Sequence, residues 1–283
     1  MKKQISDFVM DEERALYAVK DAEITHGLFD GPADGESALK ECRDVVVRDC
    51  DFHLRYPFWH AENTEIDNCR MTDTCRAALW YDKHTTINGS VLGGIKALRE
   101  CDDSKLSNCK IESTEFGWFC RGVDIKSCEL KSEYPFMHTS DMKIDDLKMQ
   151  GKYSFQYTEN IEIRNSVLDT KDAFWHGKNI TVYDSVVKGE YLAWYSENLR
   201  LVRCKIIGTQ PFCYAKNLVL EDCVMEGCDL SFENTTVQAT VKGHILSVKN
   251  PAGGSITADS IGEIILDEYQ WKTAPCTITE LDK

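Results

Sequence analysis

The 283-residue sequence lacks several features that would place it in a familiar functional class. It has no run rich in Lys and Arg, and 47 acidic residues against 33 basic ones give a formal charge of −14. Such a chain is a poor partner for the phosphate backbone of nucleic acids. No apolar segment follows the two lysines at the start, and no stretch of eighteen apolar residues occurs. The sequence therefore predicts neither a signal peptide nor contact with a membrane through a spanning helix.

The cysteines follow no metal-binding or redox pattern. There are 13 of them, an odd number, and no Cys-x-x-Cys pair. Without an export signal, we expect a cytoplasmic protein whose thiols are reduced and fill small packing positions. The chain also lacks a glycine-rich phosphate loop and a serine nucleophile elbow. The sequence therefore predicts no cofactor and no bound metal.

What the sequence does contain is a repeat. An aromatic segment behind a small-residue corner occurs at 151–157 and returns every nineteen residues, at 170–176, 189–195 and 208–214. A fixed period of this length is typical of solenoid proteins. From Asp102 to Gly254 the repeats follow each other without insertion, and earlier repeats of 19 to 23 residues bring the total to about fourteen. The extra residues fall near 30–36 and 72–76, at the corner before the aromatic segment.

Each repeat contains three short apolar segments and three corners. Asn or Asp fills the second position of most repeats, and both tolerate the left-handed backbone that a stacked corner needs. Apolar third and fifth positions lie on one face of a strand. This pattern predicts an all-β fold, a single-stranded right-handed parallel β-helix, because the apolar spacing is too uneven for the six-residue repeat of left-handed ones. We expect one domain over 1–283, with an N-terminal cap and irregular turns over 1–42 and a C-terminal cap over 235–283.

Several longer motifs resemble a known family. They are Gly35–Glu41, Tyr56–Trp59, Gly151–Gln156, Lys171–His176, Glu190–Ser196 and Gly208–Tyr214. Together they are similar to the bacterial family catalogued as domain of unknown function 3737, over nearly the whole chain. The resemblance implies a right-handed β-helix of the pectin-lyase-like architecture. It carries over no activity and no catalytic residue, because fold alone does not fix function.

Two ladders of side chains run through the aromatic segments. One holds mainly Phe and Leu, and the residue after it is mainly Trp. Neighbouring residues of a strand point to opposite faces, so we expect the more uniformly apolar Phe and Leu ladder to face the core. The Trp ladder then forms an exposed strip on which sugar rings can stack. The alternative is that the Trp ladder is itself core, or is covered by a second subunit.

Polar groups beside this strip suggest a site in the middle of the chain. The predicted ligand-binding residues are Trp118, Lys152, Gln156, Trp175, Trp194 and Tyr195. The candidate catalytic residues are Lys171, Asp172, Glu190 and His176, because lysine, carboxylate and imidazole groups can transfer protons. The alternative is a row of solvated ion pairs between strands, with His176 as a hydrogen-bonded corner residue.

Two functional hypotheses follow from the sequence. The first is a carbohydrate-binding or carbohydrate-active protein with an oligosaccharide as its ligand. If such a protein were an enzyme, polysaccharide lyase or glycoside hydrolase chemistry would suit the fold. The second is a non-enzymatic scaffold whose aromatic strip binds another protein or a second copy of the chain.

Overall fold

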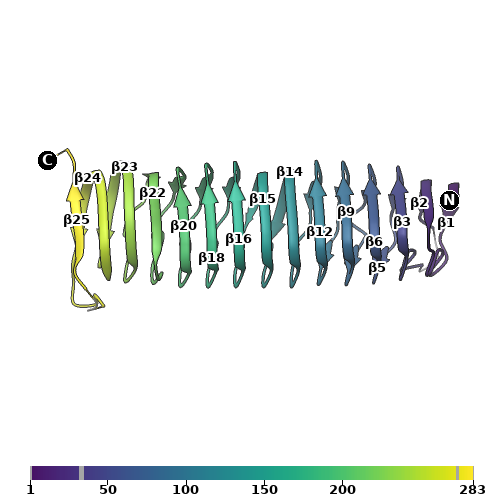
Figure 1. The fold of residues 1–283 in the computed structure, drawn as a ribbon, viewed down its shortest axis with the longest axis horizontal. Helices are drawn as coiled ribbons and strands as arrows, with labels where there is room; N and C mark the ends of the chain where they lie inside the picture. Colours follow the sequence, from purple (N-terminus) through teal and green to yellow (C-terminus); the bar gives the residue numbers. More distant parts are fainter. Residues whose placement is uncertain (1, 32–34, 272–273, 283) are drawn as a thin grey trace. The chain divides into compact units, whose positions relative to one another are not determined.

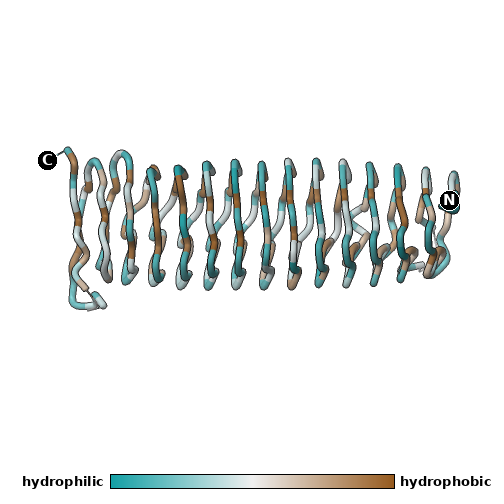
Figure 2. The backbone as a smooth tube through the Cα atoms, in the orientation of Figure 1, coloured by the Kyte–Doolittle hydropathy of each residue, from teal (hydrophilic) through white to brown (hydrophobic). Residues whose placement is uncertain are grey.

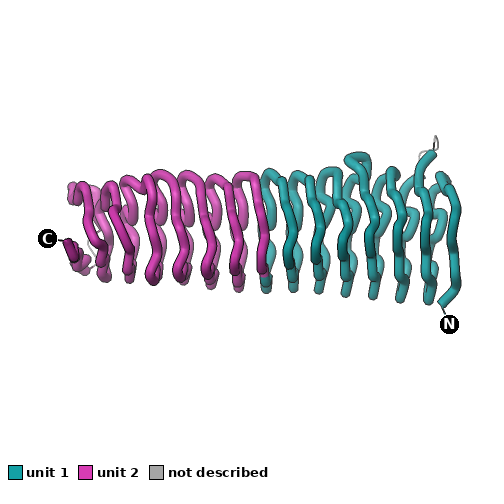
Figure 3. The backbone as a smooth tube through the Cα atoms, turned by 90° about the horizontal axis from the view of Figure 1, so that it is seen from above, with its two compact units in different colours: residues 1–143 teal, residues 144–283 magenta. Residues whose placement is uncertain are grey.

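The computed structural model describes residues 2–31, 35–271 and 274–282. In these ranges it contains 25 β-strands and no helix (Figure 1). The chain divides into two compact units, residues 1–143 and residues 144–283 (Figure 3), which are described separately below. The predicted single domain over the whole chain stays a prediction. Of the two predicted insertions, the one near 30–36 includes residues 32–34, which lie outside the described ranges.

The first unit contains the strands up to β14. They are β1 (Lys3–Met10), β2 (Ala22–Phe29), β3 (Arg43–Arg48), β4 (Asp51–Phe52), β5 (Phe58–Trp59), β6 (Glu62–Asp67), β7 (Arg70–Met71), β8 (Leu79–Trp80), β9 (Lys83–Asn88), β10 (Val91–Leu92), β11 (Leu98–Arg99), β12 (Asp102–Ser107), β13 (Lys110–Glu112) and β14 (Arg121–Glu133). The next strand, β15 (Ser140–Lys152), begins in the first unit and ends in the second.

The second unit contains the remaining strands. They are β16 (Glu159–Arg164), β17 (Val167–Asp169), β18 (Lys178–Tyr183), β19 (Val186–Lys188), β20 (Glu197–Val202), β21 (Lys205–Ile207), β22 (Leu218–Glu226), β23 (Thr236–Lys249), β24 (Gly253–Ile265) and β25 (Cys276–Glu280). β23 and β24 are long strands of 14 and 13 residues, and from β23 onward the aromatic segments of the earlier repeats are absent from the described residues.

Strand pairing within each unit follows the predicted repeat. Glu159 pairs with Lys178, and Lys178 pairs with Glu197, always in parallel and always nineteen residues on. The first strands of successive repeats begin at the predicted residues, from Arg43 in β3 to Glu197 in β20. The fold is a parallel β-solenoid of about 14 turns with a spacing of about 19 residues. Within each unit, the front strands of Figure 1 point upward while the chain advances to the left, which is the predicted right-handed sense.

The Asn and Asp corners behave as their residue types predict. In the second unit Asn160, Asn179, Asn198 and Asn217 have φ between 53° and 59°, in the left-handed region. Their side-chain amides donate to one another from turn to turn, at 3.2, 2.9 and 3.1 Å. The same residues that permit the corner therefore also connect the turns.

The core of each unit contains the Phe and Leu ladder, as predicted. Phe58 and Leu79 in the first unit and Phe155 and Phe174 in the second are almost completely buried. The rings of Phe155 and Phe174 stack with centroids 5.2 Å apart. Apolar positions recur at the same height in successive turns of each unit (Figure 2). All 13 cysteines are free and twelve are buried, in line with the predicted packing role.

The aromatic segment differs from its prediction as a third strand. It forms two-residue strands only at β5, β8 and β11, and in the second unit it is a turn. Tyr153, Phe155 and Tyr157 alternate with other residues in the left-handed region, at φ of 58°, 57° and 56°. This backbone costs about 1–2 kcal/mol per non-glycine residue, which burial of Phe155 and hydrogen bonds to the next turn offset. Tyr157 N–H, for example, donates to the Trp175 carbonyl at 2.9 Å.

One ionisable group lies inside the first unit. Asp82 is 1% exposed and stands in a ladder of small residues that includes Ala61 and Cys101. Its Oδ1 accepts a hydrogen bond from Ala61 N–H at 2.8 Å, while Oδ2 is buried without a partner. Burial raises the pKa of this carboxyl well above its ordinary value, against the smaller effect of the bond from Ala61. The folded state therefore holds the proton of Asp82 at a pH where the unfolded chain has released it.

Asp82→Asn should remove a pH-dependent loss of stability. Because the pKa of Asp82 is raised in the folded state, its contribution to the free energy of unfolding falls as the pH rises from the ordinary carboxyl range through this raised pKa. We expect the variant to be more stable than the wild type at neutral pH, with the gap closing toward pH 4. Thermal unfolding across this pH range measures the gap. Exposed Asp124→Asn is the matched control, and equal pH profiles for the two variants would contradict the assignment.

Candidate functional site

The Trp position of the second unit has a structural role that the sequence did not reveal. Trp175 Nε1 donates to the Tyr191 carbonyl at 2.7 Å, and Trp194 Nε1 donates to the Gln210 carbonyl at 2.9 Å. Gln156 Nε2 makes the same bond, to the Asp172 carbonyl at 3.1 Å. Each acceptor lies sixteen residues after its donor. Gln156 therefore replaces a tryptophan as hydrogen-bond donor and does not open a gap in the strip.

The same Trp side chains form a poorer sugar platform than expected. Trp175 and Trp194 are half-buried, and their rings stack at 5.4 Å with an angle of 2° between their planes. Rings stacked along the solenoid axis cover each other's faces, because the turns are spaced like adjacent strands. The predicted strip of exposed indole faces is therefore wrong for this pair, and what reaches solvent is an edge.

A row of more exposed aromatic residues lies one residue further along in the second unit. Tyr157, His176, Tyr195 and Tyr214 stack with successive centroid distances of 4.9, 5.2 and 5.0 Å and interplanar angles of at most 11°. Tyr157 is 48% exposed and Tyr195 is 46% exposed. We call these four residues the Tyr/His row. Its outer side presents phenol hydroxyls and imidazole nitrogens at the spacing of the turns.

The sequence contained the signal for this row. An aromatic residue or histidine follows the Trp position in four successive repeats of the second unit. All four residues have positive φ, between 54° and 60°, so they lie at corners where the side chain projects outward. The sequence pattern predicts Tyr195 as a ligand residue and His176 as a catalytic or corner residue, whereas their stacking on each other is visible only in the structure.

The candidate catalytic residues do not form one cluster. Lys171 Nζ lies 2.9 Å from Glu190 Oε2, with both side chains about half exposed. The hydrogen bond to Glu190 raises the pKa of Lys171. Such an exposed pair contributes little to stability, because water and salt screen the attraction between the two charges. Across the described residues, no hydrogen bond or ion pair joins His176 to Lys171, Asp172 or Glu190, and His176 is held between Tyr157 and Tyr195.

Asp172 is the one buried acid among these candidates. It is 7% exposed, and burial raises its pKa, while Lys171 acts in the opposite direction and Glu190 reinforces the rise. Its backbone accepts the Gln156 hydrogen bond, and its φ of 51° places it at the corner before the Phe ladder. These contacts make Asp172 part of the turn's structure.

Two predicted ligand residues take part in contacts between a cation and an aromatic ring. In the first unit, Trp118 Nε1 donates to the Tyr134 carbonyl at 2.5 Å, and the Arg99 guanidinium lies 5.6 Å from the Trp118 ring. In the second unit, Lys152 Nζ lies 5.5 Å from the Tyr153 ring. Both arrangements suit cation–π attraction.

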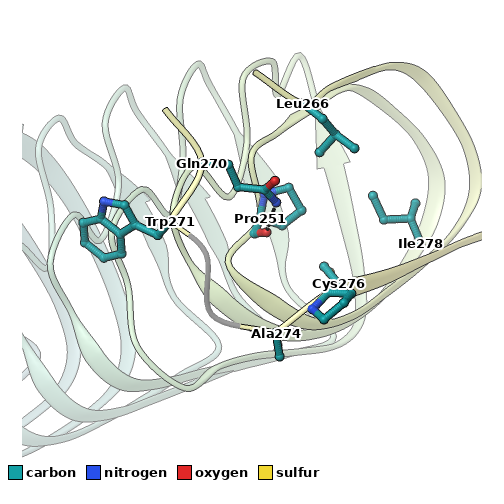
Figure 4. A pocket seen from close by; sticks show the side chains of 8 residues that line it. Pro251, Leu266, Gln270, Trp271, Ala274, Cys276 and Ile278 are labelled. Atoms are coloured by element: carbon teal, nitrogen blue, oxygen red, sulfur yellow. Dashed lines mark hydrogen bonds between the residues drawn. The ribbon is translucent and has the colours of Figure 1, made fainter. Parts of the chain in front are cut away.

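Two hollows occur away from these residues. A cavity of about 410 Å³ in the second unit is lined mainly by apolar groups from Pro251, Leu266, Trp271 and Ile278 (Figure 4). A polar hollow of about 510 Å³ in the first unit includes the pair His84 and Asp103, whose side chains lie 3.1 Å apart.

Among the residues with described positions, no three His, Cys, Asp or Glu side chains gather as metal ligands would. Nor does that part of the chain contain a long apolar helix of the membrane-spanning kind.

The pairing, the period and the buried Phe ladder define the chain as a parallel β-solenoid. The profile of the family described as "Protein of unknown function (DUF3737)" matches residues 3–279. The chain belongs to this family. A search of curated proteins gives no match.

Solved β-helix structures are similar in fold. The A-module of the Azotobacter vinelandii mannuronan C-5 epimerase AlgE4 has 8% identity and a TM-score of 0.37, with 98% of this chain and 91% of that one covered. The tailspike protein of E. coli bacteriophage HK620 has 10% identity and a TM-score of 0.44, with 93% and 60% covered. A GH87 α-1,3-glucanase catalytic domain has 11% identity and a TM-score of 0.37, with 99% and 64% covered. At these values the likenesses bear on fold alone.

Gln156→Met should destabilise the second unit. The variant keeps a side chain of similar size, but the Asp172 carbonyl loses its donor, so we expect the free energy of unfolding to fall by about 1 kcal/mol. Chemical denaturation measures the change. Exposed Gln150→Met is the control, and an equal effect from both substitutions would show that the Gln156 bond contributes nothing.

Proposed function

We propose that the chain binds an extended carbohydrate along the Tyr/His row of the second unit. The observation that carries the proposal is the regular spacing of exposed hydroxyl and imidazole groups, about 5 Å from turn to turn. A polysaccharide also repeats its hydroxyl groups at a constant interval. A linear polymer lying along the row can therefore make the same hydrogen bonds in every turn.

The chemistry of the row favours hydrogen bonding over ring stacking. Tyrosine hydroxyls donate and accept, and neutral imidazole does both through its two nitrogens. Sugar hydroxyls have the same dual capacity. Because the ring faces of Tyr157, His176 and Tyr195 cover each other, the ligand would meet their edges. Tyr214 stays a neutral phenol over the physiological range, since burial and then Glu233 raise its pKa.

Binding is favoured here over cleavage. General acid–base catalysis needs the donor and acceptor groups within reach of the same substrate bond. Lys171 is paired with Glu190, Asp172 is buried in a corner, and His176 is stacked between two tyrosines. These positions support a role for the face in recognition, with Lys171 and Glu190 as a solvated pair beside it.

The double variant Tyr157→Phe/Tyr195→Phe tests this proposal. It keeps both rings in the stack and removes only the hydroxyls, so the fold should persist. Loss of two hydrogen bonds should weaken binding at least tenfold, on the order of 1 kcal/mol for each bond. Isothermal titration calorimetry against dextran, xylan and polygalacturonate measures the affinity of wild type and variant.

The control is Tyr183→Phe, which removes a hydroxyl from a tyrosine that packs under Arg164 away from the row. It should leave binding unchanged. Absence of saturable binding to all three polymers, or equal affinities for the wild type and the double variant, would count decisively against the proposal.

A second candidate is an interface for another copy of the chain. Tyrosine is enriched at the energetic centres of protein interfaces, and the Tyr/His row is exposed over three of its four residues. If this is its role, sedimentation velocity should show a dimer whose population rises with concentration and falls in Tyr195→Glu. A monomer at all concentrations would remove this candidate.

A further inference from the structure

The first unit carries a second aromatic row with a different composition. At the position equivalent to Trp175, five successive repeats hold Lys40, Trp59, Trp80, Arg99 and Trp118. Lys40 Nζ lies 3.9 Å from the Trp59 ring centroid, and Trp59 and Trp80 stack at 5.4 Å with 10° between planes. Cations therefore stand at both ends of an indole pair. We call these five residues the basic aromatic row.

Three nitrogens of this row lack the hydrogen bond that side chains at the same position of other repeats donate to the next turn. Trp118 Nε1 donates to a carbonyl of the next turn, as do Trp175 and Trp194 in the second unit. In contrast, Trp59 Nε1, Trp80 Nε1 and Arg99 Nη1 are shielded from solvent and have no partner in the described chain. A buried donor without a partner destabilises the fold, because it has lost its hydrogen bond to water and gained none in the protein. Native structures seldom leave such groups unsatisfied, and here they follow one another in three consecutive turns.

The backbone differs in these same turns. Here the segment forms the parallel strands β5, β8 and β11 in place of a turn. The ring of Tyr56 packs against both indoles, with centroids 6.1 Å from Trp59 and 5.9 Å from Trp80. The two-residue insertion at 72–76 lies alongside, since Tyr56 N–H donates to the Arg76 carbonyl at 3.0 Å. Insertions in solenoids commonly gather on the face that binds a ligand.

Most charged groups around the row have a partner. Glu36 pairs with Arg55, Glu100 with Arg99 and Glu115 with Lys96, and Glu41 accepts a hydrogen bond from the Tyr17 hydroxyl. Lys40 and Arg76 make no ion pair within the described part of the chain.

We propose that the basic aromatic row binds an oxyanion, either a carboxylate or a phosphate group of a ligand. Indole and guanidinium nitrogens only donate hydrogen bonds, so their common partner is an acceptor. An anionic acceptor gains the most from them, because charge-assisted bonds are about twice as strong as neutral ones. Lys40 and Tyr56 are half-exposed, so a ligand reaches the row by moving side chains and leaves the strands in place. This site is independent of carbohydrate binding at the Tyr/His row.

The test uses the full chain and two anions. Inorganic phosphate and galacturonate are titrated at low salt, with galactose as the neutral counterpart of galacturonate, and binding is followed by calorimetry and tryptophan fluorescence. We expect saturable binding of at least one anion, none of galactose, and weakening by added salt. Which anion binds identifies the source of the oxyanion.

Two variants assign the binding to the row. Trp80→Phe removes one donor and keeps a ring, and Arg99→Lys keeps the charge and removes the planar set of donors. Each should weaken anion binding about tenfold. Arg121→Lys, on an exposed arginine paired with Asp141, should have no effect.

The results separate this proposal from the carbohydrate proposal. Tyr157→Phe/Tyr195→Phe should leave anion binding unchanged. Thermal melts confirm that each variant is folded. If Trp80→Phe does not fold, Arg99→Lys alone provides the test. No saturable anion binding at low salt, equal binding of galactose, or binding that survives both row variants would overturn the proposal.

Discussion

The hydrogen bonds between the backbones of successive turns are the constraint on which the structure depends. They fix each residue directly above the residue one repeat earlier, as in the pairing of Glu159, Lys178 and Glu197. Like side chains then meet like side chains, so Phe packs on Phe inside and Tyr on His outside. At each corner the backbone must adopt the left-handed conformation for the turn to close. Asn and Asp tolerate this conformation, and their side chains hydrogen-bond to one another. The core, the ion pairs and both aromatic rows follow from this alignment.

The same alignment explains why the stacked aromatic rings in this fold present their edges to a ligand. Rings one strand spacing apart are in contact distance, so stacking satisfies their faces within the chain. What remains for a ligand is the set of polar atoms at the rim of each ring. In the second unit these are hydroxyl and imidazole groups, and in the first unit indole and guanidinium nitrogens. Recognition on such surfaces is a matter of hydrogen bonding and charge.

The sequence was sufficient for the fold because the period is long, regular and free of insertions from Asp102 onward. The placement of the Phe ladder inside followed from its uniform apolar character. The covered faces of Trp175 and Trp194 could not be predicted, because alternation in a strand does not describe a segment with left-handed residues at every second position. Nor did the sequence show that Gln156 and Trp194 make equivalent hydrogen bonds, since a glutamine and an indole look unrelated until each donor is seen to point to the carbonyl sixteen residues later. Asp82 likewise looks like an ordinary acidic residue in the sequence, because its burial is visible only in the folded turn.

Gln156 also indicates how such a surface can change during evolution. At Gln156 and Trp194 this position supplies one N–H to the next turn, whereas at Trp59 and Trp80 it does not. Each turn contacts only its two neighbours, so a substitution there is felt locally. An ancestral chain could therefore acquire or lose a binding group one repeat at a time while its core stayed intact. Divergence among relatives should accumulate turn by turn on the aromatic side, giving different members different ligands on one frame.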